Sequence, residues 1–266
     1  MTASALKERE CLVVERMGRV VLVQFNRPRF GNGLNSVMVS ELAAVAGEID
    51  ADPDVRCVVL TGTGTCFSVG GDIKEMAALG DAASAGVKKL ANDAHKAVST
   101  FARMRAPLVV AVNGMAAGGG FSLAMAGDMV LASESASFTM AYSAAGLSPD
   151  GSSTYFMPRL IGLRKTQELM FTNRRLSAHE ALAWNLIHRV TADDALRSEA
   201  LALAERIAQS AVGSNAAIKS LLLSSFENGL ETQMEMEARQ IAACVESADG
   251  REGIRAFCAK RAPVFG

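Results

Sequence analysis

The chain has 266 residues with 27 basic and 28 acidic side chains, a net charge of −1. This balance argues against nucleic acid or an anionic membrane as partner, because either would be attracted by a strongly basic surface. Hydrophobic residues make up 50% and aromatic residues only 5%, so a large core must be built from aliphatic side chains and methionine. One α/β domain of this length is ordinary.

The cysteine pattern and the N-terminal segment both bear on the compartment. The five cysteines are scattered and lack C-x-x-C spacing, which predicts neither a disulfide framework nor a metal site. Residues 1–10 carry charges and no apolar segment, so we expect no secretory signal and a cytoplasmic protein. Residues 106–127 contain no charged side chain, but Pro107, Asn113 and a glycine run interrupt them. We therefore expect no membrane span there.

Apolar β-branched runs alternate with helical patterns along most of the chain. In chain order we expect strands over residues 12–15 and 20–25, a helix over 35–49, a strand over 55–60, a helix over 85–104, a strand over 108–112, a helix over 121–126 and a strand over 129–131. The repeated order of strand, glycine turn and helix predicts a layered α/β core.

The last third of the chain is predicted to be helical. Ser177 and Glu180 have the spacing of a capping box, in which each side chain pairs with the backbone of the other residue. Further amphipathic helices are expected over residues 198–209 and 232–245, and no strand pattern follows residue 200 or so. This predicts a catalytic core over residues 1–200 and a helical region over residues 201–266 that packs between subunits.

Two glycine-rich segments carry the strongest chemical signal. The first runs through Gly70 and Gly71, and the second through Gly118, Gly119 and Gly120, where a helix is expected to begin. Glycine lets a ligand approach the backbone closely, and a helix N-terminus offers unpaired N–H groups and a partial positive charge. Both features suit a developing oxyanion. Neither segment matches a phosphate-binding or dinucleotide-binding fingerprint.

In this order, the two glycine segments resemble the signature segments of the crotonase (enoyl-CoA hydratase/isomerase) superfamily. The likeness extends over nearly the whole chain. Asn26-Arg27-Pro28 with Gly33-Leu34-Asn35 resembles the opening of the family, residues 176–181 its post-catalytic helix, and residues 260–265 its C-terminal tail.

The resemblance implies an α/β fold of the crotonase type, a spiral of ββα units followed by a helical oligomerisation region. It implies a homotrimer or a hexamer made of two trimers. It also implies an acyl-CoA substrate, with coenzyme A arriving as part of the thioester and no permanently bound cofactor. A C-terminal Phe and Lys of a neighbouring subunit contact coenzyme A in this family, and Phe257 and Lys260 are the matching positions.

By motif position, the backbone N–H groups of Gly71 and Gly119 would hold the thioester oxygen. The resemblance also implies that the flanking residues bind substrate, namely Val69, Gly70, Asp72, Ile73 and Gly118. From the residue types alone, Asp72 is also expected to cap a helix beginning at Ile73.

Membership of this family would not by itself determine the reaction, because fold does not fix chemistry. Enoyl-CoA hydratases of this family use two glutamates, and this chain has Ser122 and Tyr142 at the matching positions. Neither is a good general base near neutral pH, since a phenol titrates near pH ~10. Both remain candidates for substrate binding.

Asp150 is the obvious remaining carboxylate, in Pro149-Asp150-Gly151. The tripeptide is also good turn chemistry, so a purely structural role is a real alternative. Family members that act as enoyl-CoA isomerases, including those of aromatic-acid degradation, carry an aspartate in this context and use it to shuttle a proton. We therefore predict an enoyl-CoA isomerase with Asp150 as its base.

Three alternatives stay open. One is hydratase-type activity. Another resembles 4-chlorobenzoyl-CoA dehalogenases, which use an aspartate at the Asp150 position as nucleophile and a histidine on the preceding long helix to activate water. His95 is the matching histidine, but Tyr142 replaces a tryptophan of that group. The last is a non-catalytic binding protein of this fold, and the near-neutral charge argues against RNA as its ligand.

Overall fold

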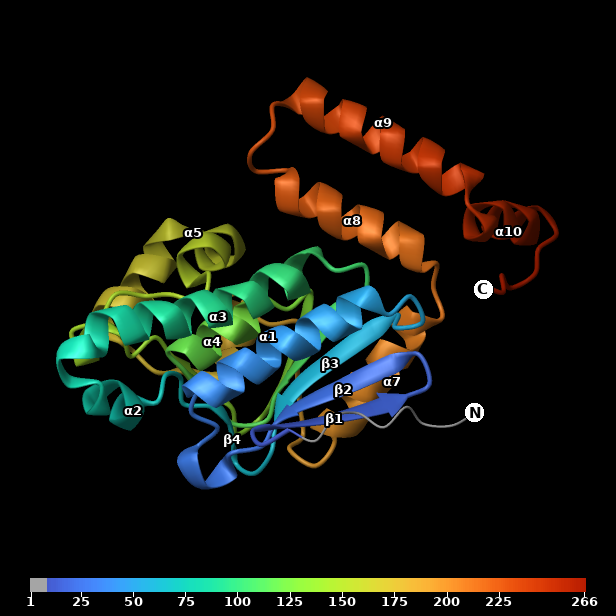
Figure 1. Ribbon diagram of the computed structural model, residues 1–266. Coiled ribbons are helices and arrows are strands. Elements are labelled where there is room, and N and C mark those ends of the chain that lie inside the picture. The colour runs from blue at the N-terminus through green and yellow to red at the C-terminus, as the bar shows by residue number, and fades with distance from the viewer. Residues whose placement is uncertain (1–8) are drawn as a thin grey trace.

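The computed structural model describes residues 9–266 and has a six-stranded main sheet at its centre (Figure 1). The first strand of this sheet is antiparallel to its neighbour, and every other pairing in the sheet is parallel. The strand order is β1 (Leu12–Met17), β2 (Val20–Phe25), β3 (Cys57–Gly62), β5 (Leu108–Val112), β7 (Met129–Ser133) and β10 (Arg189–Thr191). The strands predicted from apolar runs are all present.

Helices cover both faces of the main sheet, which is why its strands are nearly continuous apolar runs. Alternate side chains of a strand point to opposite faces. In β2, Val21, Val23 and Phe25 join the core beneath α1 (Ser36–Ala51) and α3 (Ala83–Arg103). Val20 and Leu22 join a second core beneath α7 (Leu196–Ala208).

A second, smaller sheet was not expected from the sequence, and it positions the glycine segments. Its strands are β4 (Cys66–Ser68), β6 (Met115–Ala117), β8 (Ser137–Thr139) and β9 (Leu176–Ser177), in that order. β4 and β6 are parallel, so their carboxyl ends lie at the same edge. The first glycine segment leaves β4 and leads to α2 (Ile73–Ala78). The second leaves β6 and leads to α4 (Gly119–Met125).

The C-terminal helices form an arm that projects from the core (Figure 1). The arm comprises α8 (Val212–Ser224), α9 (Leu230–Glu246) and α10 (Ala248–Cys258). α8 packs against α3, and α9 lies along α8. The boundary expected at residue 200 falls inside α7, which packs on the main sheet, so the projecting arm begins at α8.

One buried lysine ties the arm to the core. Lys219 of α8 donates hydrogen bonds to the carbonyl oxygens of Phe101 (2.8 Å) and Ala106 (3.1 Å). Its ammonium also lies 2.7 Å from the carboxylate of Asp128. The buried charge is thus paired and hydrogen-bonded, as a buried charge must be.

Side-chain caps fix the starts of several helices. The Asn35 side chain accepts the Met38 N–H (2.9 Å), and Ser177 and Glu180 form the expected capping box.

No helix within residues 9–266 is both long and apolar enough to cross a membrane. The remaining helices are α5 (Ser153–Thr172), which bends at Gly162, α6 (Ala178–Ala183) and the 3-10 turns η1 (Pro28–Phe30), η2 (Gly80–Ala82) and η3 (Ser143–Ala145).

Candidate active site

The two glycine segments touch each other at the edge of the small sheet. A Cβ atom on Gly70 would lie 2.7 Å from the Ala117 carbonyl oxygen and 3.0 Å from the Gly119 nitrogen. Gly70 also has φ of 89° and Gly118 has φ of 48°, which side chains rarely tolerate. A Cβ on Gly119 would lie 3.9 Å from the Gly71 nitrogen. The Gly71 and Gly119 N–H groups are therefore neighbours.

The backbone pairing leaves both N–H groups free for a ligand. Leu34 bridges the residues on either side of Gly71: it donates to the Gly70 carbonyl (2.8 Å) and accepts from the Asp72 N–H (3.1 Å). Gly119 is the first residue of α4, where an N–H has no helical partner. Within residues 9–266 neither N–H donates a hydrogen bond. Together they can hold one carbonyl oxygen.

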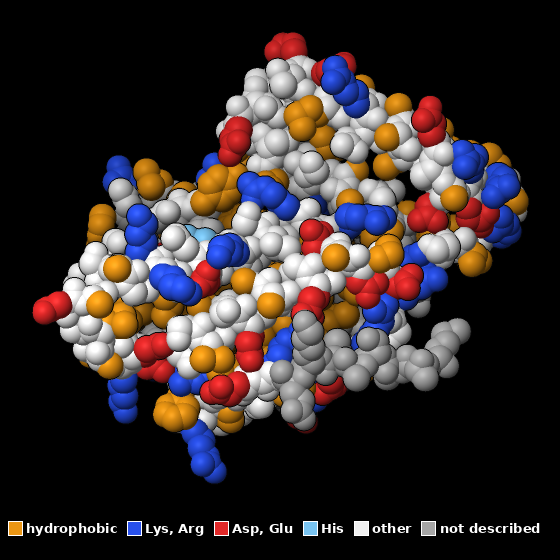
Figure 2. All heavy atoms as spheres, in the orientation of Figure 1, with side chains coloured by type: hydrophobic (Ala, Val, Ile, Leu, Met, Phe, Trp, Pro, Cys, Tyr) orange, Lys and Arg blue, Asp and Glu red, His pale blue; other side chains and the backbone are white. Residues whose placement is uncertain are grey.

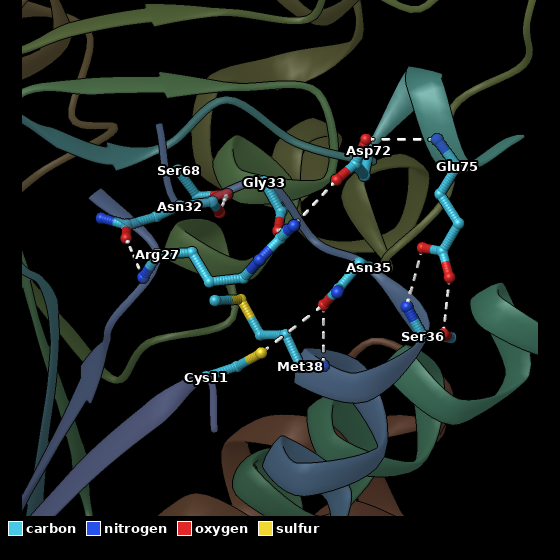
Figure 3. Close-up of polar contacts among 10 residues, drawn as sticks. All are labelled: Cys11, Arg27, Asn32, Gly33, Asn35, Ser36, Met38, Ser68, Asp72 and Glu75. Carbon is cyan, nitrogen blue, oxygen red and sulfur yellow. Dashed lines mark hydrogen bonds and ion pairs between the residues drawn. The ribbon is translucent and has the colours of Figure 1, made fainter. Parts of the chain in front are cut away.

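Polar side chains clamp the first glycine segment to the chain near residue 30 (Figure 3). The Arg27 guanidinium donates to the Gly33 carbonyl and to the Asp72 carboxylate at 3.1 Å. Glu75 of α2 accepts from the Ser36 N–H at 2.9 Å. The segments that resemble the family's opening thus fix the position of Gly71.

Asp72 caps α2, as the sequence predicts, by accepting the Glu75 N–H at 3.3 Å. Partial burial opposes ionisation of its carboxyl, but the bonds from the Glu75 N–H and the Arg27 guanidinium lower its pKa below the ordinary value. Asp72 is therefore a charged anchor of the glycine segment.

A cavity of about 580 Å³ opens beside the free N–H groups. Its walls are mostly apolar, and among the described residues Asp150 is the only carboxylate and Lys88 the only cation that line it. One wall is a face of α3 that was not predicted to line the site, although its apolar residues recur at helical spacing. These residues are Val87, Leu90, Ala91, Ala94 and Val98.

A chain of hydroxyl groups orients the carboxylate. The Tyr142 hydroxyl donates to Asp150 Oδ1 at 2.6 Å and lies 3.1 Å from the hydroxyl of buried Ser122. Burial, and then the negative charge of Asp150, raises the pKa of Tyr142 above its ordinary value. The phenol therefore keeps its proton and acts as a donor to Asp150.

His95 contacts the backbone next to this carboxylate. Its Nε2 accepts the N–H of Gly151 at 3.0 Å, a bond between residues 56 positions apart. His95 and Asp150 also line a second cavity of about 790 Å³, between α3, the start of α5 and the end of α8. Asp150 lies between the two cavities, because it lines both.

The other predicted site residues fall into three groups. Gly70, Asp72 and Ser122 stand behind the cavity wall, where they support the residues that line it. Phe257, 85% exposed on α10, and Lys260, which follows α10, belong to the arm and line neither cavity of this chain. The 580 Å³ cavity is lined by Val69, Gly71, Ile73, Gly118, Gly119, Tyr142 and Asp150.

The donor set does not suit a metal ion. Within residues 9–266 no group of three or more His, Cys, Asp or Glu side chains is close enough together to hold one. The polar groups that line the cavity are instead backbone N–H groups, the hydroxyls of Ser84, Tyr142 and Ser148, the Lys88 ammonium and the Asp150 carboxylate.

Comparison with known proteins agrees with this geometry. The enoyl-CoA hydratase/isomerase family model matches residues 15–266. The chain is 36% identical over 250 residues to the 1,2-epoxyphenylacetyl-CoA isomerase of Escherichia coli, covering 92% of this chain and 94% of that protein. It is 35% identical to the "Probable enoyl-CoA hydratase" of Mycobacterium bovis, covering 96% and 98%.

Solved structures give the same result for the fold. An enoyl-CoA hydratase from Polaromonas sp. JS666 superposes with a TM-score of 0.92 at 30% identity, covering 96% of this chain and 99% of that one. An enoyl-CoA hydratase from Bacillus anthracis superposes with a TM-score of 0.91, also at 30% identity, with the same coverage. The chain therefore belongs to the enoyl-CoA hydratase/isomerase family, the crotonase superfamily, and has its fold.

Proposed function

We propose that the protein is an enoyl-CoA isomerase that moves a double bond along a CoA thioester, with Asp150 as its single base. The observation that carries the proposal is one carboxylate lining a mostly apolar cavity together with two free backbone N–H groups. An oxyanion site and one proton carrier suffice for isomerisation.

In the proposed mechanism the thioester oxygen accepts from the N–H groups of Gly71 and Gly119. Asp150 removes a proton from the α carbon, and the electron pair moves onto the thioester oxygen to give a dienolate. The protonated Asp150 then returns the proton to the γ carbon, so the double bond moves from the 3,4 to the 2,3 position. Each oxyanion donor commonly lowers the barrier by about 3–4 kcal/mol.

Tyr142 makes Asp150 suitable for this role. Its hydroxyl occupies Oδ1, so Oδ2 is the oxygen left to exchange the proton with substrate. Tyr142 keeps its proton because its pKa is raised, and Ser122 is a neutral hydroxyl hydrogen-bonded to it, so neither offers a second base for activating water. This is the argument against two-carboxylate hydration.

Hydratase-type activity is the second candidate, and the names of several relatives favour it. A dehalogenase-like role for His95 has less support, because the Nε2 lone pair of His95 is engaged by the Gly151 N–H. A non-catalytic role has less support still, because both N–H donors are free to bind a thioester oxygen.

The test is a substrate panel on the wild type and on Asp150→Ala. We expect isomerisation of 3-enoyl-CoA by the wild type and its loss in Asp150→Ala. Hydration of 2-enoyl-CoA that Asp150→Ala leaves intact would refute the proposal. Chloride release from 4-chlorobenzoyl-CoA that depends on His95 would support the dehalogenase instead.

We also propose that the arm, within residues 201–266, packs against other copies to form a homotrimer or a hexamer. Several large apolar side chains of the arm are exposed in the single chain, and Figure 2 shows apolar side chains along its surface. Several large apolar side chains left exposed on one helical arm are typical of a surface that packs against another chain. They include Ile218 (54%), Leu222 (65%), Phe226 (67%), Met234 (56%) and Ile241 (68%).

The assembly would bring Phe257 and Lys260 to the coenzyme A of a neighbouring subunit. Light scattering on the purified protein tests the assembly. Truncation after Ser247 tests the contact: a large loss of CoA affinity in an intact oligomer supports it, and unchanged affinity contradicts it.

A further inference from the structure

The hydrogen bond from Gly151 to His95 joins the loop of the proposed base to a long helix. His95 lies on α3, and Gly151 directly follows Asp150. The Nε2–N distance is 3.0 Å. Tyr142 holds the side chain of Asp150, whereas His95 holds the backbone one residue further on.

The loop needs such a support because its backbone is strained and its surroundings are open. Residues 143–148 are exposed to solvent. Gly151 and Ser152 both have left-handed backbones, with φ of 61° and 72°, and Ser152 is not a glycine. Glycine adopts this region freely, whereas Ser152 in it costs free energy that other contacts must offset. The Gly151 N–H lies directly before the strained Ser152.

Only a neutral imidazole can accept this bond. With Nε2 as the acceptor, the proton of the neutral ring is on Nδ1. A protonated imidazolium has two N–H donors and no acceptor, so it would face the Gly151 N–H with a donor. Protonation of His95 thus removes the support of the Asp150 loop.

The side chain of His95 is accessible to solvent. It is exposed and lines the 790 Å³ cavity. The titratable or charged groups that line this cavity with it are Asp150 from the loop, Arg103 from α3, Tyr155 from α5 and Glu227 after α8. On its own helix the nearest charges in sequence belong to Asp93 and Lys96, which pair with each other at 2.8 Å.

We propose that His95 is a positioning residue whose neutral form holds the Asp150 loop in its working geometry and whose protonation releases it. The inference rests on the proposed role of Asp150 as base. It predicts an acid-side loss of turnover that belongs to His95 and adds to any effect of protonating Asp150 itself.

Three variants separate the roles. His95→Gln keeps an acceptor, the amide oxygen, that does not titrate. His95→Ala removes the acceptor at every pH. Asn92→Ala, an exposed residue of the same helix, is the matched control. We expect His95→Ala to lower kcat about tenfold at neutral pH with little change in KM, the size of one lost hydrogen bond. His95→Gln should retain most of the activity and lack the acid-side step seen in the wild type.

Amide hydrogen exchange of the peptide covering residues 147–153 gives a readout that needs no substrate. After correction for intrinsic rates, exchange should be faster in His95→Ala at all pH values and in the wild type only at acidic pH. If exchange is faster in His95→Ala but the wild type has no isomerase activity, the positioning role of His95 stands and the proposed reaction is wrong. An identical acid limb in wild type and His95→Gln, with unchanged exchange in His95→Ala, would overturn the inference.

Discussion

The two sides of the cavity are built in different ways. The oxyanion side consists of main-chain N–H groups fixed by a β-bridge, a helix start and tight glycine contacts. The carboxylate side consists of Asp150 on a largely exposed loop, held by the side chains of Tyr142 and His95. The first side suits any thioester that becomes an enolate, and a few substitutions can alter the second. We therefore expect the choice of reaction to depend on the loop side.

The N–H donors of the oxyanion side can be removed only by a substitution that changes the backbone. Gly119→Pro removes one N–H donor while keeping a residue that is favoured at the first position of a helix. We expect kcat to fall about 10²–10³-fold, the usual effect of losing one oxyanion donor, with a smaller change in KM. Steady-state kinetics on 3-enoyl-CoA measures this.

Gly213→Pro is the matched control for this change. Gly213 is in the first turn of α8, where a Cβ atom meets nothing within 4 Å. Its kinetics should match the wild type. A folded Gly119→Pro enzyme with near-normal kcat would mean that the Gly119 N–H does not hold the oxyanion.

Substitutions on the loop side should lower kcat by smaller factors. Tyr142→Phe removes the hydroxyl that donates to Asp150 and leaves the ring. One hydrogen bond to a charged group is worth about 1.5–3 kcal/mol, so we expect kcat to fall about 10- to 100-fold. Tyr155→Phe is the control, because the Tyr155 hydroxyl donates to the Leu223 carbonyl in the second cavity. Equal kinetics for both variants would contradict an orienting role for Tyr142.

The smallest expected effect is on the pH dependence of kcat at alkaline pH. Burial and the charge of Asp150 raise the pKa of Tyr142. The stabilisation from its neutral hydroxyl is therefore fully present below the unfolded value of about 10 and is lost only as the pH rises through the higher folded value. The ratio of kcat between wild type and Tyr142→Phe should stay constant from neutral pH to about pH 10. A ratio that declines well below that pH would show that the phenol ionises earlier.

The same contrast separates what could be predicted from sequence. Apolar runs such as that of β2 and local caps such as Asp72 and Ser177 depend on neighbouring residues, and each was predicted. The small sheet was missed because its strands have two or three residues, too few for a periodic pattern. α5 was missed because Pro158 and Gly162 interrupt its pattern.

The site divides in the same way. The glycine segments and Asp150 were found from motifs, and all three reach one cavity. The bond from Gly151 to His95 joins residues 56 positions apart, so no local pattern indicates it. The apolar wall on α3 could have been predicted from the helical spacing of its residues. The contact of Tyr142 with Asp150 could not, because it depends on the conformation of the loop between them.

The central claim is that Asp150 carries one proton from the α carbon to the γ carbon. The most direct test is isomerisation of 3-enoyl-CoA deuterated at C2, run in ordinary water and followed by NMR of the product. A single base predicts that part of the deuterium appears at C4, and that Asp150→Asn forms no such product. Isomerised product without deuterium at C4, or deuterium transfer that persists in Asp150→Asn, would contradict this mechanism.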